Sequence, residues 1–78
     1  MTLEAGMFAK AKAGHDKNCI YVIISVNDEY VYLADGRSRP VCRPKKKKRK
    51  HIQPVCCVRC ASVTDDTVIQ KAVKDFLK

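Results

Sequence analysis

The 78-residue chain has no tryptophan, only two histidines, and only three glycines and three prolines. Its longest uninterrupted apolar run, residues 19–24, is far shorter than the roughly 20 residues of a membrane-spanning helix, so we expect no membrane association. The first residues, MTLEAGMFAKAKAG, lack a basic start followed by an apolar core, so we expect no secretory signal and a cytoplasmic location. No serine–histidine–acid pattern, phosphate-cradling glycine loop or pair of acid–base carboxylates is visible. We therefore expect neither an enzyme nor a bound cofactor.

Acidic residues are absent from one stretch, RPKKKKRK at residues 43–50, which holds seven of the sixteen basic residues. The rest of the chain has nine basic and eight acidic residues, so nearly all of the net charge of +8 lies in this segment. Such a concentration of charge is typical of a protein that binds a polyanion, because neutralising each phosphate releases counterions.

The apolar patterns predict a mainly β domain of five short strands. A hydrophobic content of 46% favours a folded chain. The run CIYVIISV is rich in β-branched residues and predicts a central strand, whereas Pro40 favours an edge position for the strand around it. Asp35-Gly36 predicts a tight turn. The expected strands are residues 7–12, 19–26, 30–34, 37–42 and, briefly, 51–53, and tight turns between them favour a small, bent antiparallel barrel.

The C-terminal residues 64–78 change to helical spacing, with Thr64 as the expected N-cap. Asp65 and Asp66 in the first turn, and Lys74 and Lys78 near the end, complement the helix dipole. The face expected to be buried consists of Val68, Ile69, Ala72, Val73, Phe76 and Leu77.

The segment GMFAKAKAGHDKNCIYVIIS, residues 6–25, resembles a KOW motif, in which a strand and a glycine-containing loop precede a hydrophobic strand. The continuation YVYLADGRSRPVCRPKKKKRKHIQP, residues 30–54, resembles small bacterial KOW-domain proteins related to large-subunit ribosomal proteins. In those proteins an ADGR-like hairpin precedes a lysine-rich segment and an H-[LI]-Q-P-like stretch. Asn18 stands where such motifs usually have glycine, and asparagine also tolerates the left-handed conformation.

The resemblance implies an SH3-like KOW barrel that binds RNA, in particular ribosomal RNA, as a ribosomal protein or a ribosome-associated factor. We expect a barrel with a basic arm (43–51) over residues 1–53, a cysteine-containing connector over 54–63 and a helix over 64–78, in a chain that is monomeric when free. The loop 13–18 and the DGR turn would lie on the RNA-facing side. The predicted RNA-binding residues are Lys12, Gly14, His15, Lys17, Asn18, Arg37, Arg39, Arg43, Lys45, Lys46, Lys47, Lys48, Arg49, Lys50 and His51.

Plainer interpretations stay open for each of these groups. The lysines are flexible cations suited to the phosphate backbone, but the run is also compatible with a solvated linker or a nuclear import signal. The loop 13–18 is compatible with a simple hairpin connection in which Asp16 caps backbone amides. Arg37 and Arg39 are compatible with ordinary solvated side chains beside a turn.

The five cysteines, without an export signal, are expected to be thiols or metal ligands in a reducing compartment. Cys57 and Cys60 form a CxxC with Cys56 beside it, half of a zinc ribbon's ligand set, which Cys42 or His51 would have to complete. The favoured interpretation is reduced thiols in the connector, with Cys19 and Cys42 as small apolar residues at the barrel end. A thioredoxin-like role lacks its βαβ context.

A second class of function is an adaptor in transcription or translation whose barrel and helix recruit a protein. The lysine run would then serve localisation or solubility. Independently of this, the helix is expected to pack on the barrel, and the alternative is that it docks on a neighbouring ribosomal protein. Protein-binding barrels usually expose aromatic residues, and this chain has only Phe8, Tyr21, Tyr30, Tyr32 and Phe76.

Overall fold

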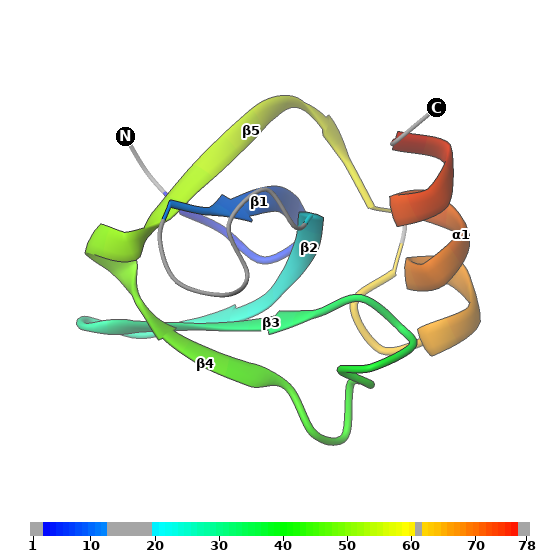
Figure 1. Cartoon of the computed structure of the whole chain (residues 1–78), viewed down its shortest axis with the longest axis horizontal. Helices are drawn as coiled ribbons and strands as arrows, with labels where there is room; N and C mark the ends of the chain where they lie inside the picture. Colours follow the sequence, from blue (N-terminus) through cyan, green and yellow to red (C-terminus); the bar gives the residue numbers. More distant parts are fainter. Residues whose placement is uncertain (1–2, 13–19, 61, 77–78) are drawn as a thin grey trace.

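The computed structural model describes residues 3–12, 20–60 and 62–76, and it is mainly β, as the sequence predicts (Figure 1). Five antiparallel strands in the order β4-β3-β2-β1-β5 curl into an SH3-like half-barrel, which a C-terminal helix follows. Nowhere in the described ranges does a helix have the length and apolar character needed to cross a membrane. The elements are β1 Met7–Ala11, β2 Ile20–Val26, β3 Tyr30–Ala34, β4 Lys45–Lys48, the 3-10 helix η1 Arg49–His51, β5 Ile52–Arg59 and α1 Asp66–Phe76.

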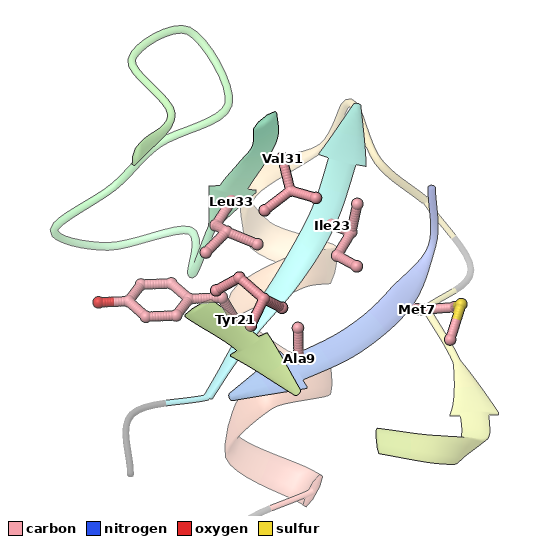
Figure 2. Close-up of a cluster of buried hydrophobic side chains, with 7 residues drawn as sticks. Met7, Ala9, Tyr21, Ile23, Val31 and Leu33 are labelled. Carbon is pink, nitrogen blue, oxygen red and sulfur yellow. The ribbon is translucent and has the colours of Figure 1, made fainter. Parts of the chain in front are cut away.

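One core cluster fills the concave, inner face of the sheet. Because side chains alternate along a strand, every second residue of β1, β2 and β3 points inward. Figure 2 shows side chains of this cluster, with Ile23, Val31 and Leu33 close together and Met7 at the margin. The buried members are Met7, Ala9, Tyr21, Ile23, Val31, Leu33 and Ile52.

A second core cluster lies between the outer face of the sheet and α1. Phe8 of β1 stacks on Phe76 of α1 with ring centroids 4.9 Å apart. Val22 and Ile69 are both fully buried in this cluster. Strand β2 therefore has apolar neighbours on both faces, which explains why its sequence is nearly continuously apolar instead of alternating.

The strand expected over residues 37–42 is absent, and this prediction is wrong. The side chain of Asp35 stabilises a turn within this segment, because its Oδ1 accepts hydrogen bonds from the backbone N–H groups of Arg37 (2.8 Å) and Arg39 (2.9 Å). The backbone N–H of Asp35 also donates to the Arg39 carbonyl at 3.0 Å. Residues 35–44 thus form a loop, and the strand that pairs with β3 is delayed to the lysine run.

This loop packs on the start of α1 (Figure 1). Gly36 has φ +79°, and a Cβ at this position would meet the Asp66 carbonyl oxygen and lie 2.7 Å from the Gln70 nitrogen. The Asp66 carboxylate accepts a hydrogen bond from the Val41 N–H at 2.7 Å. The DGR turn is therefore fixed to the helix through its glycine, while the side chains of Arg37 and Arg39 are exposed, and the RNA-facing role of the turn stays a prediction.

The helix begins one residue later than predicted, because Asp65, not Thr64, is the N-cap. Asp65 Oδ1 accepts hydrogen bonds from the N–H groups of Thr67 (2.9 Å) and Val68 (3.3 Å). The Ser62 hydroxyl in turn accepts from the N–H groups of Thr64 and Asp65, each at 3.2 Å. The side chains of Ser62 and Asp65 therefore accept hydrogen bonds from N–H groups just before α1 and in its first turn. Residues 77–78 of the predicted helix lie outside the described residues.

The last strand is longer than the short one expected at 51–53, and it takes up most of the predicted connector 54–63. Strand β5 pairs antiparallel with β1, and its register shifts between Met7, which is opposite Arg59, and Phe8, which is opposite Val55. Residues 56–58 therefore bulge out beside a single step of β1. Arg59 forms an exposed ion pair with Glu4 at 2.6 Å.

Candidate nucleic-acid interface

The lysine run, for which the sequence predicted a basic arm without a strand, forms β4 over Lys45–Lys48 and continues into η1. Strand β4 is antiparallel to β3, with Lys45 opposite Leu33, Lys46 opposite Tyr32, Lys47 opposite Val31 and Lys48 opposite Tyr30. Side chains of directly opposed residues share a face of the sheet. Since Leu33 and Val31 belong to the inner core, Lys45 and Lys47 lie on the inner side and are half-buried, whereas Lys46 and Lys48 are exposed on the outer side.

The environment of Lys45 lowers its pKa. Partial burial, and secondly the positive charge of Lys47, lower the pKa of Lys45 below its usual 10.5. The half-buried side chain of Lys45 on the inner face is also less accessible to a phosphate than the exposed side chains of Lys46 and Lys48. Of the four strand lysines, Lys46 and Lys48 therefore offer the better placed charges.

The outer face of β3 and β4 combines cations with aromatic rings. Tyr30 and Tyr32 alternate with the inward Val31 and Leu33, so both rings lie on the face that carries Lys46 and Lys48. The Lys46 ammonium lies 4.2 Å from the centre of the Tyr30 ring, within cation–π range. The sequence-based site did not include these tyrosines, although the alternation in YVYLA indicates that they share one face.

The turn η1 is anchored to the β2–β3 hairpin by Arg49. The Arg49 N–H donates to the Glu29 carbonyl at 3.0 Å, and its guanidinium donates to the Asn27 carbonyl at 3.2 Å. Asn27 itself braces the hairpin, since its Oδ1 accepts from the N–H groups of Glu29 and Tyr30. Arg49 therefore positions the turn, and its remaining N–H groups can still face a phosphate.

Three of the predicted cations meet around a hollow beside η1. The Lys12 N–H donates to the His51 carbonyl at 2.9 Å, which joins the end of β1 to the turn. The hollow has a volume of about 600 Å³ and is lined by Leu3, Lys12, Arg49, Lys50, Ile52, Gln53 and Pro54. Lys12, Lys50 and His51 are exposed. We call the cations Lys46 and Lys48 of β4, Arg49 and Lys50 of η1, and Lys12 at the end of β1 the basic strip.

The other three predicted arginines, Arg37, Arg39 and Arg43, lie in the loop that precedes β4, whereas η1 follows that strand. Arg37, Arg39 and Arg43 are exposed. The Arg43 N–H closes a turn onto the Pro40 carbonyl at 2.9 Å just before the strand begins. These arginines extend the basic surface toward α1 but do not join the group around the hollow.

Four predicted RNA-binding residues, Gly14, His15, Lys17 and Asn18, lie outside the described residues, as does Cys19. The chain from Cys56 to Val58 is part of β5, and the structure describes only its backbone. Cys60 is half-buried in the cluster under α1, and Cys42 is exposed and not at a covered barrel end as expected. Among the described side chains, no three His, Cys, Asp or Glu residues gather in a way that would hold a metal ion.

A second hollow, of about 540 Å³, lies between the end of β5 and α1. Phe8, Cys60, Val68, Ala72 and Phe76 supply its apolar wall, and Arg59, Lys71 and Asp75 are at its margin. It is a gap in the packing of the helix on the sheet and is distinct in character from the basic strip.

Comparison with known proteins adds no relative to this picture, since no family model and no curated protein sequence matches the chain.

Proposed function

We propose that this protein binds RNA through the basic strip formed by β4, η1 and the end of β1. The observation that supports this most is the exposure of Lys46, Lys48 and Lys50 along a paired strand and the turn that follows it. Alternate residues of a strand are about 7 Å apart, so the backbone holds these charges at a repeat comparable to that of successive phosphates. A strand that is already ordered loses less conformational entropy on binding than a flexible arm would.

The target that the KOW resemblance implies is ribosomal RNA, with the protein acting in the cytoplasm as a ribosomal protein or a ribosome-associated factor. The strip is suited to backbone contacts, because lysine is a compact cation that neutralises phosphate without reading bases. The strip contains five cations: Lys12, Lys46, Lys48, Arg49 and Lys50. If all are engaged, log K falls with log salt at a slope of about −3.5 on a single strand or −4.5 on a duplex.

Charge-matched variants test the proposal. The double variant Lys46→Gln/Lys48→Gln removes two charges from the strip, and Lys71→Gln/Lys74→Gln removes two from the exposed side of α1. Loss of two single-strand phosphate contacts reduces the slope by about 1.4 and, at about 0.1 M salt, weakens binding roughly 25-fold. The α1 variant should change binding little.

The readout is titration of ribosomal RNA fragments and co-sedimentation with ribosomes at increasing salt. Equal weakening by both double variants would mean that net charge alone drives binding. Unchanged binding in the β4 variant would refute the proposal. In that case, partners captured after nuclease treatment would favour the adaptor function instead.

A further inference from the structure

The two ends of the outer sheet face have different environments. At one end α1 covers Val22 and Ala34, which belong to the apolar cluster beneath the helix. At the other end Tyr30 and Tyr32 continue the same face of β3, and neither is part of that cluster. Figure 1 shows α1 at one side of the molecule and the β4–η1 corner at the other. The aromatic end of the face is thus left beside the edge strand β4.

The two tyrosines are not equivalent. Lys46 is directly opposite Tyr32, but its ammonium lies over the Tyr30 ring at 4.2 Å. The Tyr30 ring therefore already has a cation as its partner, and this contact holds the lysine stem across the face of β3. Tyr32 is half-buried and lies between the lysine and the helix-covered end of the sheet.

We infer that the outer face of β3 and β4 is a binding platform for single-stranded RNA, with a base stacked on Tyr32 and the flanking phosphates on Lys46 and Lys48. This inference rests on the proposed function and adds the form of RNA that the site takes. Stacking needs an unpaired base, because the bases of a duplex are already stacked on one another. An aromatic ring beside regularly spaced cations on an open sheet face meets this requirement and is tolerant of sequence, since every base has a π-face.

Two perturbations separate stacking from charge. Tyr32→Leu removes the ring but keeps an apolar side chain at this position of the strand, and Tyr32→Phe keeps the ring and removes only the hydroxyl. The probe is a labelled RNA strand of about ten nucleotides, free or annealed to its complement. Tyr32→Leu should weaken binding of the free strand roughly 5- to 150-fold, while the salt slope stays that of the wild type. Its affinity for the duplex should change less than about twofold, and Tyr32→Phe should bind both probes as the wild type does.

The proton resonances of the tyrosine rings in the wild-type protein give a second measurement that does not depend on how a variant folds. Addition of the single strand should shift the ring signals of Tyr32 upfield and leave those of Tyr21, which is buried in the inner core, in place. If Lys46→Gln/Lys48→Gln weakens binding but Tyr32→Leu does not, and the Tyr32 ring signals do not move, the stacking platform is refuted while RNA binding through the strip stands. If the lysine variant also has no effect, both proposals fall.

Discussion

Gly36 is where the structure predicts the largest effect from the smallest chemical change. In Gly36→Ala, the new methyl group would lie 2.7 Å from the Gln70 nitrogen, 3.0 Å from the Gln70 Cβ and against the Asp66 carbonyl oxygen. Two of these three contacts are with helix backbone, which cannot rotate away as a side-chain tip can. The first turns of α1 must therefore move off the loop if the alanine is to fit.

The cost has two parts. An L-residue in the left-handed conformation at φ +79° costs about 1–2 kcal/mol. Displacing α1 also breaks the 2.7 Å hydrogen bond from Val41 to the Asp66 carboxylate, worth about 1.5–3 kcal/mol for a charged acceptor. The free energy of unfolding should fall by about 2.5–5 kcal/mol, a large share of the roughly 4–12 kcal/mol expected for a chain of this size. Any exposure of Ile69 adds to this loss.

Gly6 offers a matched control, because it also has positive φ, +94°, but a Cβ there would find only the Cys60 carbonyl oxygen at 3.8 Å. Gly6→Ala should therefore show the conformational cost alone, about 1–2 kcal/mol. Urea unfolding followed by circular dichroism measures both variants, and each kcal/mol corresponds to a fall in Tm of about 4–8 °C. If Gly36→Ala is no less stable than Gly6→Ala, the loop does not pack on α1 as described.

Two further predictions concern the helix cap and the inward lysine. Asp65→Ala should lower the free energy of unfolding by about 1 kcal/mol, because its hydrogen bonds to Thr67 and Val68 are lost. Thr64→Ala should lower it less, and urea unfolding of both variants measures the difference. A larger loss of stability in Thr64→Ala than in Asp65→Ala would mean that Thr64 is the cap. The pKa of Lys45 is lowered below 10.5 by burial and then by Lys47, so the unfolded chain binds this proton more tightly than the folded protein does. The stability of the wild type relative to Lys45→Met should therefore rise as the pH increases from neutral through the folded-state pKa toward 10.5. A difference between the two proteins that is independent of pH in this range would contradict it.

The elements that the sequence predicts well are those whose own residues carry the signal. Strand β2 follows from its β-branched residues, because apolar neighbours cover both of its faces and Ser25, near its exposed end, alone interrupts the apolar run. Helix α1 follows from its apolar spacing. Its start was misplaced by one residue because Ser62, Thr64 and Asp65 are all good capping residues, and only the hydrogen bonds show which one completes the helix.

The strand over 37–42 was mispredicted because the decisive contact is remote in sequence. A DG pair between two apolar runs normally indicates a hairpin. Here Gly36 packs closely against the Asp66 carbonyl, and the Val41 N–H donates a hydrogen bond to the Asp66 carboxylate. Asp66 follows these residues by some 25 to 30 positions, so no local sequence pattern reveals the contact. With the loop bound to the helix, pairing with β3 can begin only after Pro44. Tertiary contact thus shifts the strand by several residues into the lysine run.

The sequence predicted a basic arm over residues 43–51 and no strand in it, which agrees with the low strand propensity of lysine and the mutual repulsion of like charges. The position of β4 at the end of the strand order explains why it nevertheless forms a strand. An edge strand presents unpaired backbone groups that invite another chain to pair, and lysines are among the residues that prevent this. Alternation then divides the run into inward Lys45 and Lys47 and outward Lys46 and Lys48. The same four residues that protect the edge thereby also place two charges beside Tyr30 and Tyr32, a combination that neither the lysines nor the tyrosines indicate separately.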